Sequence, residues 1–317
     1  MLKELGFYRG MNLGGWLSQC DYSAEHLDNF ITEPDFAQIA AWGFDHVRIP
    51  VDYNVIQSPD GAMIEAGLER IDRALDFCNR YGLHAVVDLH KAVGFSFDED
   101  EQESGFFENE RYQELFYHLW ESLASRYGRM HESVMFDLLN EVTDEAYLPA
   151  WKRISRECVR RIRSHAPRTL LLVGGCDWNS AAAVQKLDAP YDAFTVYSFH
   201  FYEPKAFTHQ GAWWESEKRD TSLRFTYEES GASREYFEKL IAPAVGKAAS
   251  EGCPLYCGEY GVIDVAAPEE ALKWVRDLHA VFENHGISRC LWSYKEMDFG
   301  FSDERMDAVR GELLKYV

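Results

Sequence analysis

The feature of this sequence that most restricts its fold is a repeated alternation of helical segments and short apolar runs. Amphipathic segments end at glycines, as at Gly43, Gly82 and Gly286, and a run rich in β-forming residues follows directly. Glycine adopts the left-handed conformation that ends a helix without steric cost, so these positions predict helix-to-strand junctions. Strands that alternate with helices are typical of βα units and a parallel sheet.

The apolar runs predict eight strands, and they are almost continuously apolar, which favours strands buried on both faces. Eight βα units in 317 residues predict an α/β fold in which residues 1–317 form a single (β/α)8 TIM barrel domain. A doubly wound open sheet is the alternative, but no glycine-rich phosphate fingerprint follows the first strand. The predicted strands lie around residues 7–13, 45–50, 84–89, 134–139, 169–173, 194–199, 254–258 and 288–292.

One predicted connection is much longer than the others. Between the sixth strand and its helix, residues from about 203 to about 239 are rich in aromatic and charged side chains. Long connections inside a compact domain are usually functional or disordered. We therefore expect an extended loop insertion that covers or extends a cleft. The acidic run 98–103 is expected to be a solvated part of the loop after the third strand, without a role.

Charge and composition argue against several classes of partner. The formal net charge is -21 at pH 7, so phosphate backbones and anionic lipid are repelled, and neither nucleic acid nor a membrane is an expected partner. A neutral or cationic ligand fits better. The seven cysteines lack the spacing of a disulfide framework or a zinc site and are expected to be reduced core thiols. We expect a monomer.

The sequence also bears on localisation. No stretch approaches the roughly 18 apolar residues of a membrane span, and the N-terminal residues lack the apolar region of a signal peptide. The expectation is either a cytoplasmic protein or a secreted enzyme whose leader has been removed.

Polar side chains gather at the predicted carboxyl ends of the strands, where barrel enzymes place their active sites. A carboxylate at the mouth of a buried strand is costly unless it is used, and Glu141 and Glu259 repeat this placement. Taken singly, each polar residue has a structural explanation, such as an ion pair for Arg48 or core packing for Trp292. Together they favour a shared site, whose members are Arg48, His90, Asn140, Glu141, His200, Tyr202, Glu259 and Trp292.

The motifs that carry these residues resemble those of clan A glycoside hydrolases, and the fuller set resembles glycoside hydrolase family 5. They are His46-Val-Arg-Ile-Pro50, Asp88-Leu-His90, Asn140-Glu141, Ser198-Phe-His-Phe-Tyr202, Glu259 and Trp292. The resemblance runs from Gly10-Met-Asn-Leu-Gly-Gly-Trp16 to Leu291-Trp-Ser-Tyr-Lys295 and is strongest to single-domain bacterial endo-β-1,4-glucanases. One residue departs from the pattern, because Lys91 stands where many relatives carry histidine, tryptophan or a small residue.

The resemblance implies a retaining cellulase that cleaves internal β-1,4 bonds of cellulose-like or mixed-linkage β-glucan and needs no cofactor or metal. Glu141 would be the acid/base and Glu259 the nucleophile that forms a covalent glycosyl-enzyme, with carboxyl groups about 5–5.5 Å apart. Arg48 and Tyr202, if close to Glu259 as in the family, favour its charged form. That charge in turn favours the protonated form of Glu141.

The same resemblance implies supporting roles. Asn140 would bind the sugar 2-hydroxyl, and Arg48, His200 and Tyr202 would support catalysis. Trp292 would form the floor under the reacting sugar. The other expected substrate contacts are His90, Trp16, Trp178, Trp213, Trp214 and Lys295, although core or loop packing explains the four tryptophans among these equally well.

Several alternatives stay open at this point. The same residues serve mannan, xyloglucan and β-1,3-glucan hydrolases, so the glycan is not fixed. A metal-dependent barrel hydrolase would use Asp88, His90, Glu141 and His200, but the chain has no His-x-His or His-Glu-x-x-His pair and its arginine would repel a cation. A non-catalytic sugar-binding barrel would be expected to lack one glutamate, and both are present.

Overall fold

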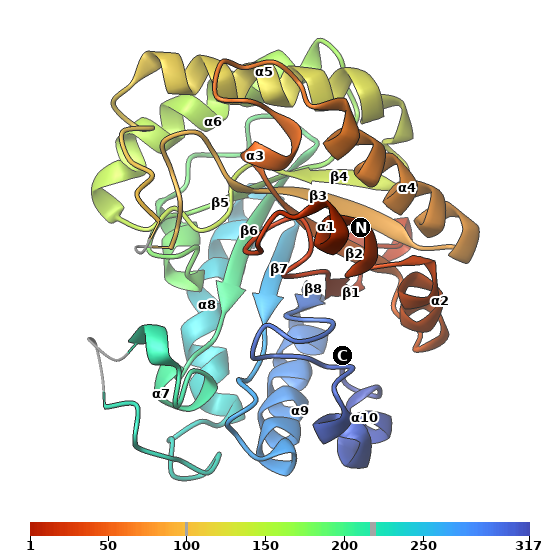
Figure 1. Cartoon of the computed structure of the whole chain (residues 1–317). Coiled ribbons are helices and arrows are strands. Elements are labelled where there is room, and N and C mark those ends of the chain that lie inside the picture. The colour runs from red at the N-terminus through yellow and green to blue at the C-terminus, as the bar shows by residue number, and fades with distance from the viewer. Residues whose placement is uncertain (99–100, 216–219) are drawn as a thin grey trace.

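The fold is a closed barrel of eight parallel strands in sequence order, each paired with its neighbours along the chain (Figure 1). This computed structural model describes residues 1–98, 101–215 and 220–317. The predicted TIM barrel is confirmed, and each predicted strand has its counterpart within a few residues. The strands are β1 (Arg9–Asn12), β2 (His46–Asp52), β3 (His84–Lys91), β4 (Val134–Asp137), β5 (Leu171–Gly174), β6 (Thr195–Phe201), β7 (Leu255–Tyr260) and β8 (Ser288–Leu291).

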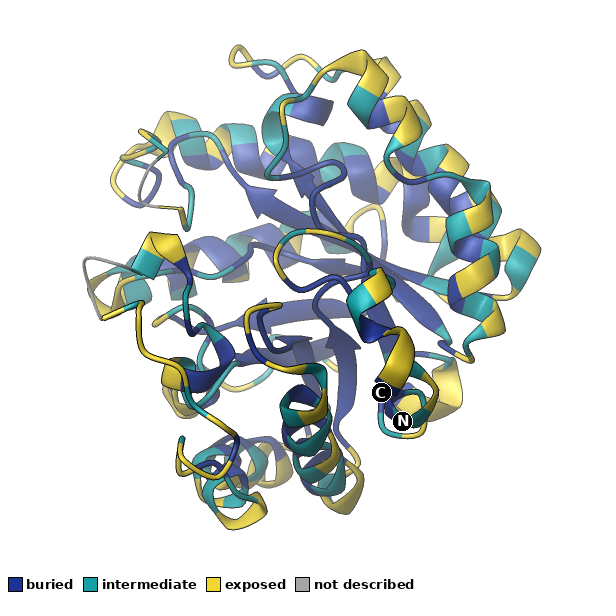
Figure 2. Ribbon diagram, turned by 60° about the horizontal axis from the view of Figure 1, so that its bottom comes forward, coloured by how far each residue is buried: buried dark blue, intermediate teal, exposed yellow. Residues whose placement is uncertain are grey.

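Helices surround the barrel and turn their apolar faces toward it, as the dark inner and yellow outer faces in Figure 2 show. The predicted spacing explains this for one helix, in which Leu68, Ile71 and Leu75 are buried together. The helices are α1 (Ala24–Asn29), α2 (Glu33–Ala41), α3 (Tyr53–Ile56), α4 (Glu65–Tyr81), α5 (Glu110–Tyr127), α6 (Leu148–Arg163), α7 (Lys205–Thr208), α8 (Arg234–Glu251), α9 (Pro268–His285) and α10 (Asp307–Leu313). The 3-10 turns are η1 (Leu2–Leu5), η2 (Gly128–Met130), η3 (Glu145–Tyr147), η4 (Ala181–Lys186), η5 (Trp213–Glu215) and η6 (Glu304–Met306).

The hydrophobic core has two main parts. A large cluster lies between the strands and the helices, and a smaller one gathers side chains such as Leu2, Phe7, Val86, Met135 and Tyr256. The smaller cluster joins a residue of η1 to residues from strands on several sides of the barrel. It therefore fills the lower part of the barrel, the end at which the strands begin. At the other end, where the strands terminate, the buried side chains include the charged residues Arg48, Asp88 and Glu259.

The long connection after β6 reaches only to Ser233, because α8 begins at Arg234 and not at the predicted position 239. The Ser233 side chain accepts a hydrogen bond from the backbone N–H of Tyr236 at 3.2 Å and so caps the helix. The connection carries α7 and η5 and extends away from the barrel beside α8 (Figure 1).

The cysteines are free thiols, six of them buried and one, Cys20, half-buried in the loop after β1. The prediction of core thiols is thus confirmed for six. Within the described ranges, no helix combines the length and the apolar character needed to cross a membrane.

Candidate active site

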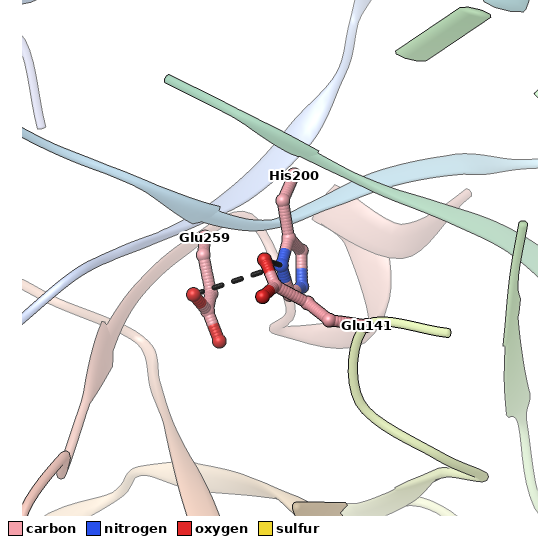
Figure 3. Close-up of side chains that lie close together, drawn as sticks. All are labelled: Glu141, His200 and Glu259. Atoms are coloured by element: carbon pink, nitrogen blue, oxygen red, sulfur yellow. Dashed lines mark hydrogen bonds and ion pairs between the residues drawn. The ribbon is translucent and has the colours of Figure 1, made fainter. Parts of the chain in front are cut away.

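Two carboxylates and a histidine meet at the C-terminal mouth of the barrel (Figure 3). A carboxylate oxygen of Glu141, one of Glu259 and a ring nitrogen of His200 all lie within 4.8 Å of one another. His200 and Glu259 stand opposite each other on the paired strands β6 and β7, and Glu141 follows β4. The structure therefore brings together the two glutamates that the sequence singled out.

Glu259 accepts hydrogen bonds from two donors. Arg48 Nη1 lies 2.7 Å from its Oε1, and the Tyr202 hydroxyl lies 2.9 Å from its Oε2. Both groups only donate here, so the arrangement suits an ionised carboxylate that is held in a fixed orientation.

Arg48 is the centre of a fully buried polar network across the barrel. Besides Glu259, its guanidinium contacts Asn12 Oδ1 at 3.1 Å, Asp88 Oδ1 at 3.1 Å, Asp137 Oδ2 at 3.1 Å and Asn140 Oδ1 at 2.9 Å. Burial alone would lower the pKa of Arg48, but the three carboxylates around it raise that pKa well above its usual value. The guanidinium is therefore permanently charged.

The two aspartates of this network face each other on adjacent strands. Burial raises the pKa of Asp88 and of Asp137 to about 7, and Arg48 opposes this rise. Because they are neighbours on β3 and β4, the protonation of each depends on that of the other. Asp137 and Asn12 were not predicted as site residues; the available signal was a polar residue inside an otherwise apolar strand.

Glu141 has a different environment from Glu259. Burial raises the pKa of Glu141 to about 7, and the positive charges of Lys205 and Arg48 act in the opposite direction. The sequence predicted this direction from the charge of Glu259, whereas burial is the largest cause in the folded protein. A carboxyl group with this pKa carries its proton over much of the neutral range and can donate it.

His200 orients Glu141. Its Nδ1 lies 2.8 Å from Glu141 Oε1 and 3.6 Å from Glu259 Oε2, and burial lowers the pKa of its ring to about 3. The imidazole is therefore neutral. Its Nε2 is buried without a partner close to the backbone of Gly258, so we place the single proton on Nδ1, where it is hydrogen-bonded.

Two further buried groups have donors or acceptors that no described side chain satisfies. Asn140 uses its Oδ1 to accept from Arg48, which leaves its Nδ2 unpaired, and His90 uses its Nδ1 on Asp88 Oδ2 at 2.7 Å, which leaves its Nε2 unpaired. Burial lowers the pKa of His90 to about 4, so this ring is also neutral. Buried polar atoms beside a carboxylate pair are groups that a ligand can satisfy.

Of the expected aromatic contacts, Trp292 lies against His90, whereas Trp16 lies in the core. Trp292 follows β8 with its ring parallel to that of His90, at 2° and 5.8 Å between centroids. Trp16 is 3% exposed and donates its indole N–H to Leu27 O at 2.9 Å. Trp16 therefore packs in the core, and its prediction as a sugar platform is wrong.

Further predicted contacts lie on loops after β6 and β8. Trp213 and Trp214 are 68% and 37% exposed on the connection after β6. The ammonium of Lys295 lies 3.5 Å from Asp35 and 4.8 Å from the Phe30 ring, so this side chain is engaged outside the site.

A left-handed turn, Asp177–Asn179, holds Trp178 beside Glu141. All three residues have φ between 50° and 56°, and Glu141 itself has φ 33°. The N–H of Trp178 donates to Val142 O at 3.2 Å, and the N–H of His200 donates to Asn179 O at 2.7 Å. The turn thus ties the segment after Glu141 to the strand of His200, and its strain is of the kind that clusters at functional sites.

The acidic run after β3 contacts the mouth of the barrel, contrary to the prediction that it has no role. Glu101 lies 2.9 Å from the ammonium of Lys91, and Glu103 accepts from the Tyr53 hydroxyl at 2.7 Å and from Gly94 N at 2.8 Å. Residues 99–100 of this run lie outside the described residues.

The side chains proposed for a metal site do not come together as one. In the part of the chain that the structure describes, the group with suitable spacing is Glu141, His200 and Glu259. A guanidinium already lies 2.7 Å from Glu259, and Asp88 is bound to Arg48 and His90. This donor set is balanced by an arginine, which would repel a metal ion.

The fold and this site together define a class, the parallel β/α barrels that carry a proton-donating carboxyl and a second carboxylate at the C-terminal mouth. Comparison with known families agrees with this class and narrows it. The family model described as cellulase (glycosyl hydrolase family 5) matches residues 9–298. The chain belongs to this family and is therefore a glycoside hydrolase, as the sequence motifs indicated.

Individual relatives are similar over nearly the whole chain. Cellodextrinase A of Ruminococcus flavefaciens is 54% identical over 289 residues, which cover 91% of this chain and 86% of that protein. Endoglucanase C of Acetivibrio thermocellus is 38% identical over 336 aligned residues, covering 98% and 97%. Among solved structures, cellulose synthase subunit Z of Clostridioides difficile superposes with a TM-score of 0.83 at 26% identity, covering 98% of this chain and 99% of that one.

Proposed function

We propose that the protein hydrolyses internal β-1,4-glucosidic bonds of β-glucans with retention, through a covalent glycosyl-enzyme. The observation that carries this proposal is the proximity of Glu141 and Glu259, whose carboxylate oxygens come within 4.8 Å. Inverting glycosidases keep their carboxyl groups about 6.5–9.5 Å apart to admit a water molecule, whereas retaining enzymes keep them about 5–5.5 Å apart.

In the first half-reaction, Glu259 attacks the anomeric carbon and Glu141 donates its proton to the departing oxygen. The bond between carbon and Glu259 forms as the glycosidic bond breaks, and the leaving sugar departs as a neutral alcohol. The two donors on Glu259 aim the carboxylate, and burial supplies Glu141 with the proton that it needs.

In the second half-reaction, Glu141 takes a proton from water, and the resulting hydroxide attacks the anomeric carbon and releases Glu259. Esterification has removed the charge of Glu259, so the ionised form of Glu141 meets less repulsion at this stage. The N–H of the neutral His200 ring, 2.8 Å from Glu141, stabilises that ionised form. At the end Glu141 is protonated again and Glu259 is ionised, as at the start.

The substrate assignment rests on the relatives and on chemistry. A neutral glucan suits a chain with a net charge of -21, and both named relatives are glucan-degrading enzymes by their names. The similarity to a cellodextrinase favours a second candidate, in which short soluble cello-oligosaccharides rather than polymers are cleaved. The unpaired Asn140 Nδ2 is suited to the sugar 2-hydroxyl, and His90 Nε2 to another hydroxyl.

Azide distinguishes the roles of the two glutamates. In Glu259→Ala, activity on an aryl cellobioside should be lost and azide should restore it with an α-glycosyl azide as product, because azide replaces the nucleophile. In Glu141→Ala, azide should rescue an activated substrate with a β-glycosyl azide, because the glycosyl-enzyme still forms. Full activity of Glu259→Ala, or identical azide products from both variants, would contradict the assignment.

A hydrolysis panel tests the substrate. The rates on cello-oligosaccharides, carboxymethylcellulose, barley glucan, laminarin, glucomannan and xyloglucan are compared, with sizing of the products. We expect the highest kcat/KM on β-1,4-linked glucose chains and no loss of activity after EDTA treatment. A preference for mannan or laminarin would refute the proposed linkage.

A further inference from the structure

A buried lysine lies at the rim of the site, at the end of β3. Lys91 ends β3, directly after His90, and is only 8% exposed. Lysine is almost never buried without partners. Its ammonium donates to the Tyr22 hydroxyl at 3.1 Å and to Glu101 Oε1 at 3.0 Å, and lies 3.9 Å from Asp52 Oδ2. We call Tyr22, Asp52, Lys91 and Glu101 the Lys91 clasp.

The clasp joins two loops. Tyr22 belongs to the loop after β1, and its hydroxyl donates to Asp52 Oδ2 at 2.6 Å. The same oxygen accepts from the backbone of Gln19 at 3.0 Å, so Asp52, at the end of β2, holds this loop in two places. Glu101 belongs to the loop after β3. Lys91 therefore fastens the loop after β3 to the loop after β1 across the end of β2.

The loop after β3 is also held against the site at other points. The ring of Phe97 meets the His90 ring edge-on, with centroids 4.9 Å apart, and Glu103 is fixed by Tyr53 and by the backbone of Gly94. These anchors lie on both sides of residues 99–100 and involve described residues only. The described parts of the loop, around Phe97 and from Glu101 to Glu103, thus form a fixed wall beside His90.

The order of the strands shows which part of a bound chain would meet this wall. Glu141 follows β4 and Glu259 lies on β7. A glycan that passes between them therefore has one end over the arc of β5 and β6 and the other end over the arc of β8, β1, β2 and β3. One arc carries Trp178 and the connection after β6. The other, from β8 to β3, carries Trp292, the expected floor of the reacting sugar, and the clasp. The clasp therefore lies on the side of the sugars that stay on Glu259.

We propose that Lys91 is a specificity-determining residue that limits how many sugars the site accepts on the non-reducing side of the cleaved bond. The clasp holds the loop after β3 as a barrier there, so cleavage falls near the non-reducing end of short chains. This inference rests on the proposed β-1,4-glucanase function and selects soluble oligosaccharides as the class of substrate.

The test compares product lengths from cellohexaose labelled at its reducing end. The wild-type protein should leave the label mainly in long fragments. In Lys91→Met, which keeps the length of the side chain but removes its charge, the label should also appear in short fragments. The ratio of kcat/KM on carboxymethylcellulose to that on cellotetraose should rise about fivefold. Lys273→Met is the matched control, because Lys273 also holds two carboxylates, Glu228 and Glu270, but on α9.

A second variant guards against a general loss of structure. Glu101→Gln changes a half-buried loop residue and should shift the products in the same direction as Lys91→Met. Unchanged product lengths in both variants, with the wild-type protein active on cellohexaose, would overturn the role of Lys91. Inactivity of the wild-type protein on every β-1,4-glucan would instead overturn the proposed function itself.

Discussion

Burial gives Glu141 the proton that a general acid needs, while hydrogen-bond donors surround Glu259. The two side chains are the same residue type, so the different roles that we propose for them come from their neighbours. The pKa of Glu141 is raised to about 7 by desolvation, and the nearby charge of Lys205 acts against this. The protonation state of one carboxyl group should therefore govern the alkaline side of the activity profile.

We predict that kcat/KM declines above about pH 7, and that it approaches a tenfold loss per pH unit, because only protonated Glu141 can donate. Removing a positive charge in Lys205→Met should raise the pKa of Glu141 and move this decline to higher pH. The measurement is a pH profile on an unactivated cello-oligosaccharide. Lys247→Met is the control, because it removes an ion pair on α8, and the pH at which kcat/KM declines should not change in it. If the decline in Lys205→Met also stays at the wild-type pH, the prediction is contradicted.

Most residues that meet at the mouth could be predicted from the sequence, because each stands at a strand end within a recognisable motif. Asn12 and Asp137 could not. Each is a polar residue inside a predicted strand, a signal that does not identify a partner, and their shared contact appears only when Arg48 reaches them from β2. The causes of pKa shifts were also out of reach, since burial is a property of the folded chain.

At the level of elements, the connection after β6 presents two of its aromatic side chains, Trp213 and Trp214, to solvent. We predict that Trp213→Ala raises KM for long cello-oligosaccharides about fivefold while kcat changes little, as expected for the loss of one aromatic contact. Leu223→Ala is the control, because this residue is 50% exposed on the same connection but offers no ring. If Trp213→Ala has the same KM as the wild type for cellohexaose as well as for cellotriose, this role is contradicted.

The elements themselves were predictable where the physical signal is local. Apolar runs mark the strands, and glycines with positive φ at 43, 82 and 286 mark the junctions before β2, β3 and β8. The loops were not predictable in the same way. Lys91 ends β3, Glu101 lies in the loop that follows, and Tyr22 lies far earlier in the chain, so their meeting depends on how β1, β2 and β3 pair side by side.

For the whole molecule, Arg48 links the proposed catalytic carboxylate Glu259 to the stability of the barrel. The lower barrel is filled by apolar side chains, whereas the upper barrel is held by one guanidinium among three carboxylates. Arg48→Met would leave these carboxylates without a buried counter-charge, and we predict a loss of about 3–5 kcal/mol in the free energy of unfolding. Urea denaturation measures this.

A double-mutant cycle separates charge from packing. Asp137→Asn added to Arg48→Met should recover part of the lost stability, because one uncompensated carboxylate is removed. Arg276→Met, at an exposed ion pair with Asp277 on α9, should change stability by less than about 1 kcal/mol. Strict additivity of the two substitutions would argue that shape, and not charge, is what Arg48 contributes.

The single half-buried thiol gives the molecule a natural attachment point for a probe. Cys20 lies in the loop after β1, between Gln19 and Tyr22, which both bond to Asp52, whereas the other six thiols are buried. Burial raises the pKa of the Cys20 thiol, so a maleimide dye should attach slowly and faster in alkaline buffer. Fluorescence from that one position would then report whether the loops after β1 and β3 separate while a sugar chain enters and leaves. The rest of the protein would be unmodified.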